Sequence, residues 1–279
     1  MSTSPLTIKG LYPNINPEDN VVFIGLDTRE TMAYLVAKHS IERLSPGVKV
    51  LPLYTKDLRQ AGIYSRTMIT EGTTGQYIDE LEDRPHSVDF SFTRFLVPHI
   101  ARELGIKGYT IFCDCDFLFT QDLNPLFSYL NTIFIDAPLA VVKHKFPTYT
   151  VNKMDGCSQV SYNNKLWSAF MCFNTQHKDL DSLTPCLVNK ASGMNLHQFG
   201  WLNGGEGNIV ALPERFQFIP GHSQPELNLP FVIHYTEKAP WFVGANNTKG
   251  DIYSDLWWDE VELWKQTVSK TPRGSVLWI

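Results

Sequence analysis

The sequence lacks the features that mark several common classes of protein. No run of Lys and Arg occurs in its 279 residues, and the net charge is −5, so nucleic acid is not expected as the main partner. No stretch reaches about 18 uninterrupted apolar residues, which a membrane-spanning helix would need. The first residues lack a charged segment followed by an apolar one, so we expect no secretory signal. These absences predict a cytoplasmic globular protein without a transmembrane segment.

The cysteines are few, and their pattern points away from disulfides and zinc. The chain has five Cys, an odd number. Cys113, Cys115 and Cys172 lie in apolar, strand-like surroundings, which suits reduced, buried thiols in a cytosolic protein. The spacing of Cys113 and Cys115 does not fit a zinc site, and no second Cys/His pair completes one.

The order of the apolar segments predicts the fold class. Val21–Leu26 and Val48–Tyr54 are apolar runs typical of buried strands, and the segment between them has helical spacing from Thr28 onward. This β-α-β opening implies a parallel sheet. Strands alternate with helices through the first half, and short mixed elements fill the second. We therefore predict an α/β fold with a mostly parallel central sheet, flanking helices and a smaller mixed sheet in the second half.

Length and composition fit a single domain. Hydrophobic residues make up 43% of the chain and charged residues 19%, which are globular values. No internal repeat or low-complexity linker divides it. We predict one domain over residues 1–279, with an N-terminal arm at 1–20 and a C-terminal extension at 244–279. Residues 55–87 show no clear pattern, and the polar residues 145–165 are interpreted as a surface excursion.

The stretch Tyr109–Phe119 carries the strongest chemical signal. Asp114 and Asp116 follow an apolar run at its C-terminal end. Residues i and i+2 of a strand point to the same side, so an extended backbone aims both carboxylates into one space. They repel each other there unless a cation lies between them, and hard oxygen ligands of this kind suit Mg²⁺ or Mn²⁺. The alternative is that one Asp caps the following turn and the other is solvated.

A second polar side chain ends another apolar strand. His234 follows Phe231–Ile233, and a neutral imidazole is an acceptable third ligand for the same cation. Three protein ligands leave open positions, which ions of this type normally fill with substrate phosphates. The P-loop and Rossmann motifs for binding phosphates are absent. The alternative is that His234 is a hydrogen-bonded core residue.

Several of these features occur together in a fixed order along the chain. They are Asp27 at a strand end, Arg94 in a helical segment, the Phe112–Phe119 stretch, Phe173-Asn174, and His234-Tyr235 followed by Pro240-Trp241. From about residue 20 to residue 243 the sequence resembles the GT-A-fold glycosyltransferases of family 8, the group that contains glycogenin and bacterial galactosyltransferases. The resemblance implies a GT-A-like single domain.

The resemblance also implies an enzyme, a hexosyl- or pentosyltransferase acting in glycan synthesis. Such an enzyme moves a sugar from a nucleoside-diphosphate sugar, with a UDP-sugar favoured, to a hydroxyl of a carbohydrate or glycolipid acceptor. It implies Mn²⁺ or Mg²⁺ as the cofactor, bound by Asp114, Asp116 and His234. The residues implied to bind the nucleotide sugar are Leu26, Asp27, Thr28, Arg94, Asp114, Cys115, Asp116, Ser168 and Lys238.

The implied catalytic residues depart from the family pattern. Gln198 resembles the Gln that faces the anomeric carbon in such enzymes, but His197 stands where an Asp usually precedes it. Glu206 or His197 could instead be a general base, and retention is favoured over inversion. Ala239 occupies the position of a Lys that often contacts the diphosphate, with Lys238 one residue earlier.

Trp201 and Trp241 are candidates to stack on the acceptor sugar, with core packing as the alternative.

A sugar nucleotidyltransferase can share this architecture, but it calls for a Gly-rich, basic loop after the first strand, which Gly25–Arg29 does not provide. A non-catalytic carbohydrate-binding protein on the same fold is the other alternative.

Overall fold

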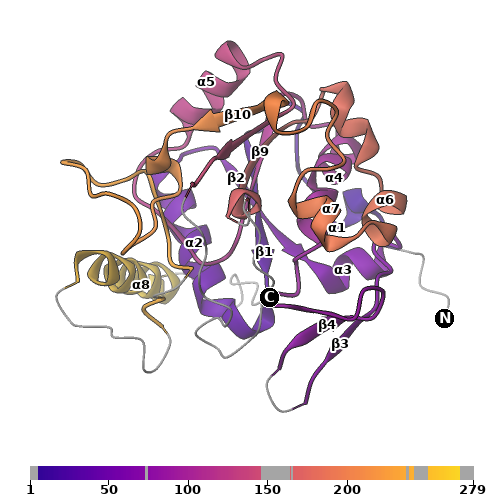
Figure 1. Cartoon of the computed structure of the whole chain (residues 1–279). Helices are drawn as coiled ribbons and strands as arrows, with labels where there is room; N and C mark the ends of the chain where they lie inside the picture. The colour runs from indigo at the N-terminus through magenta and orange to yellow at the C-terminus, as the bar shows by residue number, and fades with distance from the viewer. Residues whose placement is uncertain are drawn as a thin grey trace.

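A six-stranded sheet forms the centre of the molecule (Figure 1). The structure, a computed structural model, describes residues 6–72, 75–145, 164, 166–236, 239–241 and 251–270. The strands lie in the order β10-β8-β9-β6-β1-β2, and β9 is antiparallel to both of its neighbours, whereas the other adjacent pairs are parallel. The strands are β1 (Val21–Leu26), β2 (Lys49–Tyr54), β6 (Tyr109–Cys113), β8 (Leu139–Val142), β9 (Phe170–Asn174) and β10 (Ile209–Leu212). The sheet is mostly parallel, so the predicted α/β fold class is confirmed.

Helices cover both faces of this sheet. Figure 1 shows α2 and α8 on one side of it and α4, α6 and α7 on the other. The helices are α1 (Ile8–Leu11), α2 (Thr31–Leu44), α3 (Thr55–Gln60), α4 (Val97–Leu104), α5 (Asn124–Ile133), α6 (Pro185–Lys190), α7 (Gly193–His197) and α8 (Ile252–Lys270). Short 3-10 turns lie at Thr28–Glu30, Thr93–Leu96, Trp167–Ala169, Lys178–Ser182, Gly205–Asn208 and Glu214–Phe216. Within the described ranges, no helix combines the length and apolar character that crossing a membrane requires.

The central strands are buried on both faces, which explains their unbroken apolar sequences. Every residue of β1 and of β6 is buried. The two strands are parallel neighbours, with Ile24 paired to Cys113. Their carboxyl ends therefore meet at one edge of the sheet. Asp27 and Asp114, which directly follow these strands, lie at that edge, where open α/β sheets bind their ligands.

Two small antiparallel sheets flank this edge. The first pairs β7 (Phe117–Phe119) with β11 (Val232–His234), and its register places His234 opposite Phe117. The second contains β3 (Met68–Thr70), β4 (Tyr77–Asp79) and β5 (Arg84–His86). It arises from residues 55–87, where the sequence shows no clear pattern.

Some predicted elements differ in the structure. The apolar run Phe216–Ile219 is typical of a short strand, but in the structure it contains the end of a 3-10 turn and one isolated bridge from Phe218 to Ile233. The spacing of apolar residues over Phe90–Leu104 predicts one helix, but the structure has a turn, a 3-10 segment and then α4, with a proline in the first turn of α4. Most of residues 145–165 lies outside the described residues.

The two ends of the described chain pack onto the domain. Near the N-terminus, Tyr12 is buried against the Phe23 ring, and its hydroxyl donates to the Pro52 carbonyl at 2.9 Å. Helix α8 packs on α2, where the buried Glu260 carboxylate accepts hydrogen bonds from Arg43 and contacts His39 Nδ1 at 2.7 Å. The described parts of the predicted arm and extension therefore belong to the folded body.

A glycine in β1 allows an aromatic ring to pack against the sheet beside the ligand edge. A Cβ atom at Gly25 would lie 2.4 Å from the Phe90 ring, which is fully buried. We expect Gly25→Ala to lower the free energy of unfolding by about 1–3 kcal/mol, because overpacking a rigid core forces side chains or backbone to shift. Urea denaturation measures the change. The control is Gly72→Ala, where nothing lies within 4 Å; equal denaturation midpoints for the two variants would contradict the expectation.

Candidate active site

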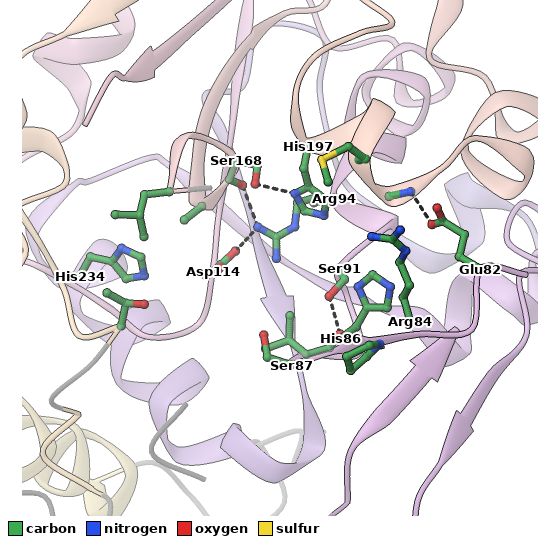
Figure 2. A pocket seen from close by; sticks show the side chains of 17 residues that line it. Glu82, Arg84, His86, Ser87, Ser91, Arg94, Asp114, Ser168, His197 and His234 are labelled. Atoms are coloured by element: carbon green, nitrogen blue, oxygen red, sulfur yellow. Dashed lines mark hydrogen bonds and ion pairs between the residues drawn. The ribbon is translucent and has the colours of Figure 1, made fainter. Parts of the chain in front are cut away.

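A pocket opens at the carboxyl edge of the central sheet, with about 830 Å³ of empty space that is partly continuous with solvent (Figure 2). The segment from Glu82 to Ser91 forms one wall, and Ser168 with helix α7 forms another. Asp114 and His234 lie at one end.

The two strand-end carboxylates and the distant imidazole come together at this end. One ligand atom from each of Asp114, Asp116 and His234 lies within 4.8 Å of the others, and all three residues are buried. His234 Nε2 is 3.3 Å from Asp116 Oδ1. The pairing of β7 with β11 causes this proximity, since Phe117 lies directly opposite His234. The sequence separation of more than 100 residues is closed by one short antiparallel ladder.

The imidazole of His234 is held in place by its neighbours. Its ring stacks on Phe117 with the centroids 4.2 Å apart, and its Nδ1 lies 3.2 Å from Gln217 Nε2. Gln217 also donates to the Leu166 carbonyl at 2.8 Å. Contacts of this kind orient a ligating histidine. Sequence reasoning missed Gln217, because a single Gln in a short apolar segment carries no signal.

Arg94 balances part of the negative charge. Its Nη1 lies 2.9 Å from Asp114 Oδ1 and donates to the Ser168 carbonyl at 2.8 Å. The guanidinium also lies over the Phe90 and Phe112 rings, at 5.3 and 5.1 Å from their centroids. The site thus combines two carboxylates with one buried guanidinium. Carboxylates grouped in this way are ligands that a divalent cation accepts.

His197 and Ser168 face the middle of the pocket. Ser168 Oγ lies 2.8 Å from His197 Nδ1, and the imidazole packs edge-on against Phe95. The next residue, Gln198, is exposed at the C-terminal end of α7 and does not line the pocket. His197 therefore lines the pocket, whereas Gln198 does not.

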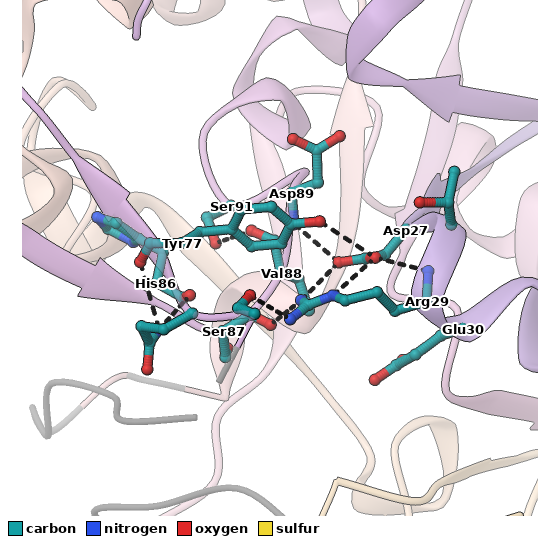
Figure 3. A network of polar contacts seen from close by, with 12 residues as sticks. Asp27, Arg29, Glu30, Tyr77, His86, Ser87, Val88, Asp89 and Ser91 are labelled. Atoms are coloured by element: carbon teal, nitrogen blue, oxygen red, sulfur yellow. Dashed lines mark hydrogen bonds and ion pairs between the residues drawn. The ribbon is translucent and has the colours of Figure 1, made fainter. Parts of the chain in front are cut away.

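Asp27 lies at the same sheet edge but does not line the pocket, and its carboxylate belongs to a network of polar contacts (Figure 3). Its carboxylate is 0% exposed and pairs with Arg29 at 2.8 Å. Burial alone would raise its pKa, but the hydrogen bonds and charge of Arg29 outweigh burial and hold the pKa of Asp27 below its usual value. Burial and the nearby Asp27 charge raise the pKa of Asp89 to about 6.

Most of the remaining expected site residues lie away from the pocket. Leu26 is buried, and Thr28 is exposed in the turn after β1. Cys115 is buried with its Sγ 3.2 Å from Glu30 Oε2, and burial followed by this carboxylate raises its pKa. Glu206 is exposed in the 3-10 turn before β10.

The two tryptophans are also placed by the structure. Trp201 is buried, its indole N–H donates to the Leu196 carbonyl at 3.1 Å, and it packs against Phe95. Trp241 is half-buried against Trp257. Neither lines the pocket. Lys238 lies outside the described residues.

Comparison with known proteins gives the family and the fold. No family model matches the sequence. Protein CDI of Arabidopsis thaliana is 35% identical over 248 residues, which cover 86% of this chain and 85% of that protein. The chain belongs to the Protein CDI family. That name does not describe a reaction.

Solved structures of glycosyltransferases share the fold. GlyE of Streptococcus pneumoniae TIGR4 superposes with a TM-score of 0.52 at 16% identity, covering 94% of this chain and 67% of its own. The galactosyltransferase LgtC, solved with donor and acceptor sugar analogues, gives a TM-score of 0.50 at 13% identity, covering 87% and 95% of the two chains. WbbM, a bifunctional glycosyltransferase, gives a TM-score of 0.51 at 15% identity, and the match covers 90% of this chain and 53% of the WbbM chain. At these identities the likeness shows the GT-A fold alone.

Proposed function

We propose that this member of the Protein CDI family is a metal-dependent glycosyltransferase. It moves a sugar from a nucleoside-diphosphate sugar, with UDP-sugars favoured, to a hydroxyl of a carbohydrate or glycolipid. The observation that carries the proposal is the convergence of Asp114, Asp116 and His234 at one end of a pocket, on a fold shared with glycosyltransferases. That this chain is a glycosyltransferase of family 8 also stays a prediction.

The donor set fits Mn²⁺ or Mg²⁺. Two carboxylates and one imidazole are ligand types that both ions accept, and the three side chains are already close before any ion is considered. A divalent cation held there supplies Lewis-acid stabilisation of the charge that develops on a leaving diphosphate.

The chain's own residues then divide the remaining tasks. Arg94 places a buried positive charge next to Asp114, where it can stabilise anionic phosphate oxygens. Ser168 fixes the imidazole of His197 through its Nδ1, so the ring is oriented within the pocket. His197 is better placed than Gln198 or Glu206 to contact a bound sugar or to exchange a proton with an acceptor hydroxyl. Retention over inversion stays a prediction.

The proposal is tested by nucleoside diphosphate release from a panel of UDP-, GDP- and ADP-sugars. We expect turnover of a UDP-sugar with Mn²⁺ and its loss when EDTA removes the ion. Calorimetry with UDP and Mn²⁺ accompanies the assay. Metal-dependent nucleotide binding without turnover of any donor would indicate a binding protein instead. If neither binding nor turnover occurs, the proposal is wrong.

A further inference from the structure

The carboxylate of Asp27 is saturated by the protein itself. Oδ1 accepts hydrogen bonds from the Arg29 backbone N–H at 2.9 Å, from Arg29 Nε at 3.0 Å and from the Tyr77 hydroxyl at 3.4 Å. Oδ2 accepts from Arg29 Nη2 at 2.8 Å and from the Asp89 N–H at 3.1 Å. An ionised carboxylate offers about four acceptor sites, so five donors leave none for a ligand. Its 0% exposure agrees with this.

The guanidinium of Arg29 links Asp27 to a different part of the chain (Figure 3). Its Nη1 donates to the Gly75 carbonyl at 2.9 Å, and its Nη2 donates to the Ser87 carbonyl at 2.7 Å. It also lies over the Tyr77 ring, 4.2 Å from the centroid. These partners are 46 to 58 residues away in sequence. Gly75 lies in the loop between β3 and β4, and Ser87 directly follows β5, so Arg29 ties that small sheet to the end of β1.

The segment that Arg29 holds is a wall of the pocket. It carries Glu82, Arg84, His86, Ser87 and Ser91, all of which line the space opposite Ser168 and α7. Figure 2 shows Arg84 and His86 pointing from this wall toward the cavity. Glu82 is fixed from the other side, since its carboxylate accepts from Arg66 and from the Gly193 N–H. The position of the wall sets the width of the site.

We propose that Arg29 is a positioning residue for this wall and that Asp27 acts through Arg29 rather than by binding the nucleotide. The inference rests on the proposed function for its kinetic readout. The Asp27–Arg29 pair spans the sheet edge and the wall, and it holds the pocket at the width that a donor requires. Both residues then affect the same step, so the effects of replacing them on donor binding are not additive.

The kinetic test compares Arg29→Met, Asp27→Asn and the double variant. We expect each single change to raise the donor KM about tenfold with kcat within about twofold, the loss typical of a charge-assisted hydrogen-bond link. The donor KM of the double variant is expected to be no higher than that of the more impaired single variant, because both changes remove the same link. Relative affinity for UDP, GDP and ADP stays unchanged. A shift in base preference with Asp27→Asn alone, or additive losses, would overturn the proposal.

Hydrogen–deuterium exchange tests the same inference without any activity. In Arg29→Met we expect faster exchange for amides of residues 76–88 and unchanged exchange in β6 and β9. The control is Arg43→Met, which breaks the ion pair with Glu260 far from the pocket and leaves the wall protected. Unchanged exchange of residues 76–88 in Arg29→Met would overturn the positioning role. This test does not depend on whether Asp27→Asn folds. If the wild-type protein turns over no donor, the proposed function is wrong, and the exchange measurement still decides whether Arg29 positions the wall.

Discussion

Replacing Asp116 with Asn is expected to lower donor turnover at least about 100-fold, the scale seen when one preorganised charge-stabilising group is lost. Asp116 is buried with its Oδ1 3.3 Å from His234 Nε2, so the change removes a negative ligand while keeping the side-chain shape. It is a cleaner test than Asp114→Asn, which would also leave the buried Arg94 without its carboxylate partner. Initial rates at saturating Mn²⁺ measure the effect.

The control for this variant is Asp136→Asn, a carboxylate on the exposed turn after α5, away from the pocket. It is expected to keep wild-type turnover. Thermal melting of both variants separates loss of function from loss of fold. Because the proposed ligands bind cation and donor together, we also expect Mn²⁺ and UDP to stop stabilising Asp116→Asn against melting. Undiminished turnover in Asp116→Asn would refute the proposed metal site and the proposed reaction.

The elements that sequence reasoning located are those whose cause is local. β1 and β6 are continuous apolar runs because both faces of each strand are buried. Asp114 and Asp116 stand out because polar residues interrupt such a run at its end. His234 stands out for the same reason, and the β7–β11 ladder brings it to the acids. These features depend on the order of residue types along the chain, which the sequence displays directly.

The parts that could not be predicted depend on contacts between distant segments. Strands β3, β4 and β5 have three residues each and are partly exposed, so neither length nor alternation identifies them. Asp27 has the expected place at a strand end, yet its surroundings come from residues 75–89, which no local pattern relates to it. The burial of Trp201 against Phe95 likewise follows from tertiary packing.

The largest expected effect on stability comes from a buried ion pair behind the pocket wall. Arg66 Nε and Nη2 donate to Asp79 Oδ1 and Oδ2, both at 2.7 Å, and the two side chains are 1% and 0% exposed. Arg66 also contacts Glu82 at 3.0 Å and lies 3.8 Å from the centre of the Phe92 ring. One guanidinium therefore compensates two carboxylates and packs against the core.

We expect Arg66→Met to lower the free energy of unfolding by about 3–5 kcal/mol, because it leaves Asp79 as an uncompensated buried charge. Urea denaturation at neutral pH measures the loss. Adding Asp79→Leu to Arg66→Met is expected to restore part of it, since the charge left behind is then removed as well. The control is Lys265→Gln, which breaks the exposed pair with Glu262 and is expected to change stability by less than about 1 kcal/mol. If Arg66→Met unfolds at the same urea concentration as this control, the pair contributes little and the β3–β5 wall is held by its other contacts, with Arg29 foremost among them.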